Sequence, residues 1–291
     1  MNKIGDSELI INNDGSIFHL HLKPENIADT ILLVGDQSRV ATISELFDSV
    51  EFRVQNREFI THTGVYKGKR ISVLSTGIGT DNIDIVINEL DALVNIDLKN
   101  RVPKDNHTKL NFIRIGTSGA LQADIPVDTP IASHTSIGFD GMLNFYAGRN
   151  SVCNLQMEKS FVEFMNWNPL LAKPYFVEAS SELLNKLASE FRKGVTISAP
   201  GFYGPQGRVL RLPIADAEIN NKITDFEYLN QKITNYEMES SAIYGLSKLL
   251  GHEALTVCCI IANRIRKEYS KDYKTAVKDL IMKVLDSVVK A

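Results

Sequence analysis

An arginine and a hydroxyl-rich segment bounded by glycines adjoin each other in Arg114-Ile115-Gly116-Thr117-Ser118-Gly119. The apolar run Asn111–Ile113 leads into this segment and is typical of a strand, so we expect the arginine at a strand end and a turn at Gly116–Gly119. Backbone N–H groups, hydroxyl donors and a fork-shaped guanidinium all favour an oxyanion such as phosphate. A plain tight turn after a strand would use the same residues. The segment alone leaves both interpretations open.

Two further apolar runs end in glycine. In Gly35-Asp36-Gln37-Ser38-Arg39 an arginine again follows the glycine, and Thr76-Gly77-Ile78-Gly79 supplies two glycines that let a backbone approach a ligand closely. The complete Gly-x-Gly-x-x-Gly fingerprint and the Walker-type phosphate loop are both missing from the sequence. We therefore expect no nucleotide cofactor bound in either of those ways.

Two acids and a methionine, Glu237, Met238 and Glu239, precede an apolar helical pattern and are expected to begin that helix. Acids in the first turn of a helix are favourable by themselves, because they face the positive end of the helix dipole. A carboxylate that points into a cleft could instead accept hydrogen bonds from both hydroxyls of a vicinal diol. Both interpretations stand at this level.

Glycine and proline are dense in Gly201–Arg208, which predicts a loop. This loop holds an aromatic pair, Phe202 and Tyr203, and a polar pair, Gln206 and Arg208. Glutamine both donates and accepts, whereas arginine only donates. The polar pair therefore suits the edge of a pyrimidine base, with its two carbonyls flanking an N–H. An ordinary polar loop is the alternative.

Strand-like runs alternate with helical patterns along most of the chain. The predicted strands are Thr30–Val34, Ile71–Ser75, Asn111–Ile115, Ile131–Thr135, Val195–Ser198 and Ala254–Ala262. Helical spacing covers residues 83–94, the vicinity of 180–191, 238–250 and 277–288. This order predicts an α/β fold, a three-layer α/β/α sandwich with a central mixed, largely parallel sheet, in a single domain over residues 1–291. Ligands collect at the carboxyl ends of strands in such sheets, where the glycine-rich segments fall.

The composition limits the class of protein. A net charge of −3 and a pI near 6.1 argue against a general nucleic-acid binder, so any anion site must be local. The three cysteines, Cys153, Cys258 and Cys259, form neither a disulfide framework nor a metal-binding spacing, and no metal is expected. Residues 1–13 lack a signal-peptide core, and no apolar run approaches the roughly 18–20 residues that span a bilayer. We expect no membrane association and a cytoplasmic location.

Taken together, the motifs resemble those of the nucleoside phosphorylases of the hexameric type, and most closely the branch that acts on uridine. The matching segments keep the family's order over nearly the whole chain: Phe18-His19-Leu20, Gly35–Arg39, Asn56–Phe59, Ser75–Gly79, Arg114–Ala120, Phe202-Tyr203 with Gln206 and Arg208, Tyr236–Ser240 and Asn263-Arg264. The resemblance implies phosphate-dependent cleavage of a nucleoside. Inorganic phosphate would be a co-substrate, and no cofactor would be required.

The resemblance also implies a role for each matched residue. Inorganic phosphate would be held by Gly35, Arg39, Arg114 and Thr117, with Arg57 reaching in from a neighbouring subunit. The ribose would be bound by Glu239, the backbone at Met238, Glu237 close by, and His19 from the neighbour. The base would meet Phe202, Gln206, Arg208 and Arg264. Arg208, Gln206 and Arg114 would be catalytic. Shared sites imply a homo-oligomer with a dimer as its minimal unit, and the family's usual assembly implies a hexamer.

Two departures from the family pattern bear on these expectations. Purine-specific members have an aspartate after the late apolar strand, where this chain has Asn263 and then Arg264, which favours a pyrimidine. The family's Gly-Pro-Ser is replaced by Thr80-Asp81-Asn82, which argues against the monovalent cation (K⁺) site found between subunits in some members, although Glu58 is present. The alternatives are a phosphorylase for a purine or a 2′-deoxypyrimidine nucleoside, or a nucleoside-binding homologue without turnover.

Overall fold

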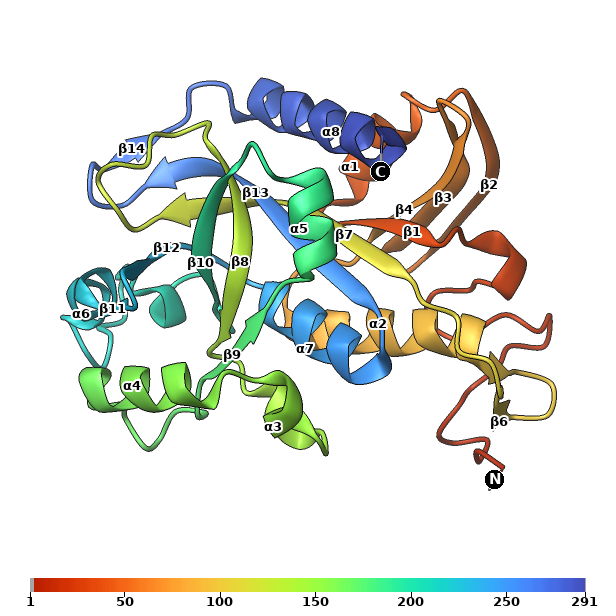
Figure 1. The fold of residues 1–291 in the computed structure, drawn as a ribbon, viewed down its shortest axis with the longest axis horizontal. Helices are drawn as coiled ribbons and strands as arrows, with labels where there is room; N and C mark the ends of the chain where they lie inside the picture. The colour runs from red at the N-terminus through yellow and green to blue at the C-terminus, as the bar shows by residue number, and fades with distance from the viewer. Residues whose placement is uncertain (1–2, 291) are drawn as a thin grey trace.

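A twelve-stranded mixed sheet forms the centre of the computed structural model, which describes residues 3–290 (Figure 1). The strands on the main path are, in spatial order, β11 (Glu227–Tyr228), β12 (Gln231–Glu237), β10 (Arg192–Ser198), β8 (Pro130–Gly138), β13 (Glu253–Asn263), β7 (Asn111–Ala120), β1 (Thr30–Val34), β4 (Lys69–Ser75), β3 (Phe59–Tyr66) and β2 (Ser49–Asn56). The remaining two strands, β9 (Tyr175–Glu178) and β14 (Glu268–Tyr269), pair with β8 and β13. Every predicted strand is confirmed.

Helices cover both faces of this sheet (Figure 1). Figure 1 shows α2 and α7 packed together below the central strands and α8 above them, and α5 packs against α8 and β13. The α-helices are α1 (Gln37–Ser44), α2 (Thr80–Asn95), α3 (Arg149–Val152), α4 (Leu155–Met165), α5 (Ser181–Leu187), α6 (Ile219–Asp225), α7 (Ser240–Leu250) and α8 (Tyr273–Lys290). Short 3₁₀ turns lie at Pro24–Asn26, Met142–Phe145 and Gly204–Gln206, and a separate hairpin joins β5 (Ile96–Asp97) to β6 (Val102–Pro103). The three-layer α/β/α prediction is confirmed.

The pattern of apolar residues explains these elements. The strand β1 is buried at every position, as expected for a parallel strand covered on both faces. Helix α2 buries Ile83, Val86, Ile87, Leu90 and Leu93 along one face, which is the spacing that predicted it. Helix α7 ends at Gly251, whose left-handed backbone (φ 80°) suits glycine at this position. Among the described residues, no helix is both long enough and apolar enough to cross a bilayer.

One pairing that the sequence did not predict closes part of the sheet on itself. Strand β12 pairs with β10 in parallel, and its end also pairs with the end of β7 in antiparallel fashion, through Asn235 with Ala120 and Tyr236 with Gly119. The strands β12, β10, β8, β13 and β7 therefore form a continuous ring. The closure brings the carboxyl end of β12 next to Arg114 on β7.

Candidate active site

The Arg114 guanidinium lies buried at the centre of the predicted site. Its Nε donates to Glu237 Oε2 at 3.3 Å and its Nη2 donates to Glu239. Its Nη1 is buried without a hydrogen-bond partner among the described residues. Burial lowers the pKa of Arg114, but the Glu239 and Glu237 carboxylates outweigh that effect and raise the pKa above its ordinary value. The side chain is thus a fixed cation with one unused donor nitrogen.

The segment after Arg114 is a strand, so the predicted glycine-bounded turn is wrong. Strand β7 continues to Ala120 and pairs in parallel with β13 through Gly116 with Cys258 and Thr117 with Cys259. A Cβ atom on Gly116 would stand 2.8 Å from Arg114 Nη1 and 3.0 Å from Cys258 Sγ. Glycine is required here because a guanidinium occupies the space of a side chain, not because the chain turns. Thr117 is half-buried on the same strand.

Arg39 approaches the same strand from α1. Its Nη1 donates to the Ile115 carbonyl at 3.2 Å. Burial lowers the pKa of Arg39, and the nearby Arg114 cation lowers it further. Gly35 follows β1 and lies beside the turn after β4, since a Cβ there would lie 3.4 Å from the Gly77 carbonyl oxygen. Two neighbouring cations repel each other, so an anion between them is favourable.

The sequence predicted that the two glutamates beside Arg114 begin a helix, but both precede its first residue. Glu237 is the last residue of β12, and helix α7 starts at Ser240 with Glu239 at its N-cap position. Glu239 accepts from the Gly79 N–H at 2.8 Å, which joins α7 to the glycine turn before α2. Burial raises the pKa of Glu239 and the Arg114 cation opposes that shift. Met238, between them, is half-buried.

The predicted base-binding residues lie together. Gln206 Oε1 accepts from Arg208 Nη1 at 2.6 Å and from Arg264 Nη2 at 2.5 Å. The Arg208 guanidinium lies over the Phe202 ring, 3.8 Å from its centroid, and that of Arg264 lies 4.8 Å from the centroid of Tyr236. Burial and the Arg208 cation lower the pKa of Arg264 to about 10. Because Gln206 Oε1 faces two cations, its Nε2 is the group left to face a ligand carbonyl.

His19 and Arg57, the two residues expected to act in a neighbouring subunit, share one surface patch of their own subunit. The Arg57 guanidinium lies 5.9 Å from the centroid of the Phe18 ring, and His19 Nδ1 lies 2.6 Å from Glu89 Oε1. Asn56 Nδ2 donates to the His19 carbonyl at 2.8 Å. Among residues 3–290, no hydrogen bond or ion pair joins either side chain to Arg39 or Arg114.

Asn263 ends β13, the strand after which the resemblance places an aspartate in purine-specific members. Its Nδ2 donates to the carbonyls of Gln122 at 2.9 Å and Ile125 at 2.7 Å, and its Oδ1 accepts from the Arg266 N–H at 2.9 Å. The side chain is buried, and both its Nδ2 and its Oδ1 are already hydrogen-bonded to backbone groups. A carboxylate in this place would face two carbonyl oxygens.

A cavity of about 860 Å³ overlaps this site only at the base-binding loop. It lies between the loop after α4 and the segment 200–219, and apolar side chains such as Trp167, Leu171 and Leu212 line most of it. Arg208 and Tyr203 also line this cavity, whereas Gln206 and Arg114 do not. It therefore borders the base-binding loop and is not lined by the residues around Arg114.

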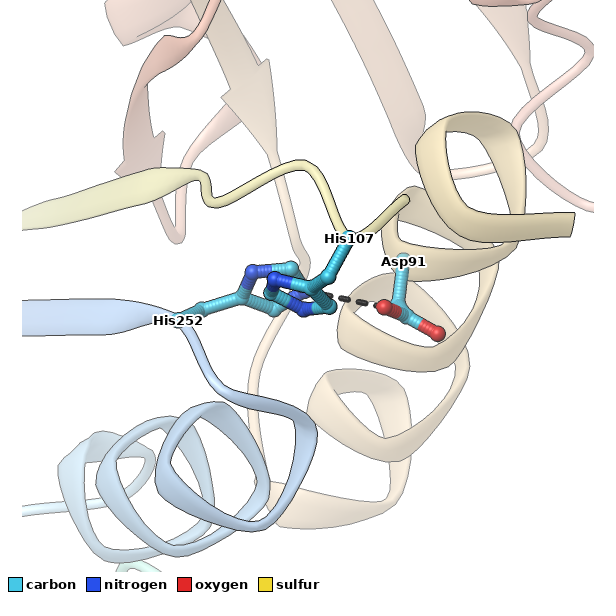
Figure 2. Close-up of side chains that lie close together, drawn as sticks. All are labelled: Asp91, His107 and His252. Atoms are coloured by element: carbon cyan, nitrogen blue, oxygen red, sulfur yellow. Dashed lines mark hydrogen bonds and ion pairs between the residues drawn. The ribbon is translucent and has the colours of Figure 1, made fainter. Parts of the chain in front are cut away.

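Three potential metal ligands meet elsewhere, beside the end of α2 (Figure 2). One ligand atom each from Asp91, His107 and His252 lies within 4.8 Å of the others. His252 Nδ1 accepts from the Leu110 N–H at 3.1 Å, so the ring proton sits on Nε2 and is donated to Asp91 at 3.1 Å. A metal on Nε2 would require an imidazolate. The geometry therefore indicates a structural hydrogen-bond network.

Three contacts of the two glutamates were not predicted from the sequence. Ser198 and Ser240 contact Glu237, and Gly79 contacts Glu239. The signal for Ser198 was present, since it is the last residue of a predicted strand and strand ends meet at one edge. The contact of Tyr236 with Arg264 depends on the ring closure and has no local signal.

Comparisons with known proteins agree with the resemblance. A family model described as the phosphorylase superfamily matches residues 29–291. A uridine phosphorylase of Thermococcus kodakarensis is 32% identical over 258 residues, covering 89% of this chain and 81% of the relative. A DeoD-type purine nucleoside phosphorylase of Listeria welshimeri is 30% identical over 277 residues, covering 94% of this chain and 99% of the relative.

A solved structure is similar along its whole length. It is a nucleoside phosphorylase of Trypanosoma brucei described as showing uridine phosphorylase activity, 28% identical, with a TM-score of 0.88 over 97% of this chain and 100% of that one. A uridine phosphorylase of Phytophthora capsici, 20% identical with a TM-score of 0.70, covers 100% of this chain and 99% of its own and shares the fold. From its sequence and its structure, this chain belongs to the phosphorylase superfamily.

Proposed function

We propose that the protein cleaves the N-glycosidic bond of uridine with inorganic phosphate, giving uracil and ribose 1-phosphate, as a pentosyltransferase of pyrimidine nucleoside salvage. The observation that carries the proposal is the cluster of Gln206, Arg208 and Arg264. Uracil departs with negative charge, so two guanidiniums at its edge stabilise the transition state more than the substrate. The names of the relatives from Thermococcus kodakarensis and Trypanosoma brucei support this substrate.

Phosphate would be the nucleophile at the edge where Arg39 and Arg114 converge. Gly35 and Thr117 complete its site within one subunit, and Arg57 is contributed by the neighbour. A phosphate oxygen attacks the ribose anomeric carbon, the C–N bond breaks, and the electron pair leaves with uracil, which then takes a proton from water. Most of the acceleration comes from positioning the phosphate and from placing charge at the developing ions.

The ribose would be held between phosphate and base. Glu239 accepts the 2′- and 3′-hydroxyls, with the backbone of Met238 beside it and Glu237 close by, and the neighbour's His19 meets the 5′-hydroxyl. The placement of His19 and Arg57 on one surface patch supports a homo-oligomer with a dimer as its minimal unit, assembled further into a hexamer. We further propose a single domain over residues 1–291, since the family match spans most of the chain, and a cytoplasmic location, in keeping with three free thiols.

The contacts of Asn263 weigh against a purine substrate. A purine base leaves most readily when an acid protonates N7, and the side chain at this position is an amide bonded to backbone carbonyls. The purine nucleoside phosphorylases among the relatives make the question worth a direct test.

A nucleoside panel tests the proposal. Uridine, 2′-deoxyuridine, thymidine, inosine and adenosine are incubated with the enzyme and phosphate, and the free base is measured by chromatography. We expect the highest kcat/KM for uridine. Faster cleavage of inosine or adenosine would replace the proposal with a purine phosphorylase, and binding of uridine without any product would indicate a homologue that has lost turnover.

A further inference from the structure

Glu237 has no hydrogen-bonding capacity left for a sugar. Its Oε1 accepts from Ser198 Oγ at 2.5 Å, from Ser240 Oγ at 2.7 Å and from the Ser240 N–H at 3.1 Å. Its Oε2 accepts from Arg114 Nε at 3.3 Å, from the Glu239 N–H at 3.0 Å and from the Ser240 N–H at 3.0 Å. A carboxylate offers about four lone-pair positions. A ribose hydroxyl could bind Glu237 only by displacing one of these donors.

Glu239 differs in this respect. It accepts from the Gly79 N–H and from Arg114 Nη2, one donor on each oxygen. Each of its oxygens keeps a free lone pair, which is what a vicinal diol needs. The two carboxylates that flank Arg114 are therefore unequal, because one is saturated and the other is open.

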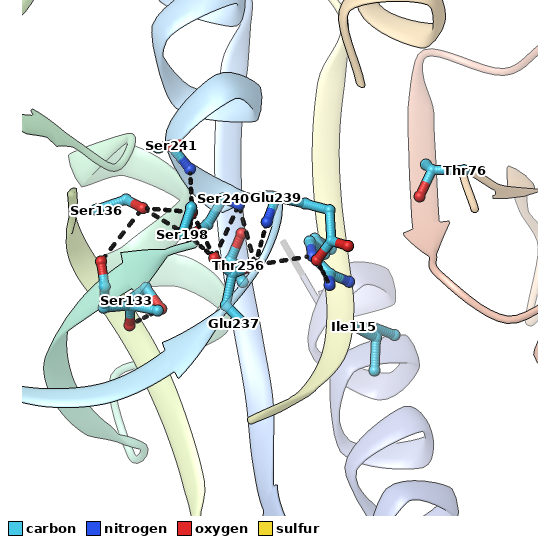
Figure 3. Close-up of polar contacts among 12 residues, drawn as sticks. Thr76, Ile115, Ser133, Ser136, Ser198, Glu237, Glu239, Ser240, Ser241 and Thr256 are labelled. Carbon is cyan, nitrogen blue, oxygen red and sulfur yellow. Dashed lines mark hydrogen bonds and ion pairs between the residues drawn. The ribbon is translucent and has the colours of Figure 1, made fainter. Parts of the chain in front are cut away.

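Hydroxyl groups from several elements fix the orientation of Glu237 (Figure 3). Ser198 ends β10, and its Oγ also accepts from the Ser241 N–H at 2.9 Å. Ser240 begins α7, and its Oγ lies 2.6 Å from Ser136 Oγ on β8. The contacts cross the closed ring of strands and tie Glu237 to the N-terminus of α7. A buried polar network in which every member is satisfied makes the side chain rigid.

From this asymmetry we propose that Glu237 is a positioning residue, not a ribose ligand: with Ser198 and Ser240 it fixes the guanidinium plane of Arg114 toward phosphate. Glu239 accepts the ribose diol on its free lone pairs, and Glu237 remains the saturated counter-charge of Arg114. A buried arginine left with no carboxylate would be strongly unfavourable, so this permanent partner leaves Glu239 available to the sugar. The inference rests on the proposed function and refines the roles within its site.

Glu237→Gln tests the inference in the assembled enzyme. The amide keeps the size of the side chain, and the Ser198 and Ser240 hydroxyls can turn to accept from its NH₂. We expect kcat to fall by about 10- to 100-fold, since the hydrogen bond to Arg114 Nε loses its negative acceptor, with the KM for uridine within about 2-fold of wild type. A KM for uridine raised by about 10-fold or more with kcat preserved would show that Glu237 binds ribose and would overturn the inference.

Ser198→Ala provides a milder second variant, with Ser133→Ala as its matched control. Ser133 is a buried serine of the same ring whose hydroxyl lies 2.6 Å from Thr196 Oγ1 and does not contact Glu237. We expect kcat to fall by about 5-fold in Ser198→Ala only. Equal kinetics in the two variants, with only a lowered Tm in each, would reduce the role of Glu237 to stability and contradict the inference.

A separate measurement distinguishes failure of this inference from failure of the proposed function. If wild type does not cleave uridine with phosphate, the proposed function fails, and the positioning role is then measured by calorimetric titration with inorganic phosphate. Binding weakened by about 3-fold or more in Ser198→Ala and unchanged in Ser133→Ala would support the role. The same phosphate Kd in all three proteins would exclude it.

Discussion

The Arg114 guanidinium lies directly over Gly116, two residues further along the same strand. A Cβ atom on Gly116 would stand 2.8 Å from Arg114 Nη1 and 3.1 Å from its Cζ. The glycine thus leaves the room in which the arginine folds back along its own strand. The absence of a side chain at Gly116 therefore sets the position of the Arg114 guanidinium.

Gly116→Ala should therefore damage the phosphate site. The added methyl group pushes the guanidinium away from Glu237 and Glu239, and overpacking of this kind costs about 1–3 kcal/mol in the free energy of unfolding. We expect the KM for phosphate to rise by about 10-fold or more. Steady-state kinetics and urea unfolding measure the two effects. Gly5→Ala, where the new Cβ would meet only Glu8 Cγ at 3.8 Å, is the control; an unchanged phosphate KM in Gly116→Ala would contradict the prediction.

Arg208→Ala should separate base recognition from phosphate binding. Arg208 contacts Gln206 and Phe202 and has no contact with Arg114 among the described residues. We expect kcat/KM for uridine to fall by about 100-fold, because a donor to the departing uracil is lost, and the KM for phosphate to stay within about 2-fold. The exposed Arg211, three residues on, supplies the control Arg211→Ala. An equal loss for both substrates would show that Arg208 does not recognise the base.

Much of the fold was predictable because each element carries its own periodicity. The run Thr30–Val34 is buried throughout, and α2 buries one face, so neither needs distant information to be recognised. The stretch 116–119 was misread because glycine has two uses, in turns and in close packing. Only the position of the Arg114 side chain distinguishes them, and that depends on the three-dimensional arrangement.

The candidate site was predictable as a set of residue types, but the differences between their environments were not. Gln206 and Arg208 lie in a loop and Arg264 follows a strand end, and both features could be recognised in the sequence. The convergence of these three residues was therefore predictable. Ser198 reaches Glu237 because β10 pairs with β12 and the two residues are in register, and the β12–β7 closure brings Arg114 to the same carboxylate. Pairing of strands distant in sequence leaves no local signal.

Asn263→Asp should not convert the enzyme to purines. The new carboxylate would face the Gln122 and Ile125 carbonyls that the amide now donates to. Replacing the amide donors by a buried, unpaired carboxylate costs about 3–5 kcal/mol in the free energy of unfolding. We expect a lower urea midpoint and no gain in inosine phosphorolysis. Asn106→Asp adds the same charge at an exposed position and should leave both unchanged; a stable Asn263→Asp enzyme that cleaves inosine would contradict this account.

Asp140 should make the stability depend on pH. Burial raises the pKa of this carboxyl, although hydrogen bonds from the Met142 N–H, Tyr175 and Ser241 oppose the shift. An acid whose pKa is raised on folding is most favourable when protonated, so its contribution to stability is present below about pH 4 and is lost as the pH rises through its folded pKa. Asp140→Asn mimics the protonated state. The Tm of Asp140→Asn minus the Tm of wild type should therefore be larger at pH 8 than at pH 4. A difference that does not change with pH would contradict a raised pKa of Asp140.

The dependence of uracil release on inorganic phosphate tests the central claim most directly. Uridine is held at saturation, phosphate is varied upward from zero, and uracil and ribose 1-phosphate are both quantified. The account predicts no release without phosphate, a rate that saturates with phosphate, and equal amounts of the two products. Release of uracil at the same rate without phosphate, with free ribose as the second product, would contradict it.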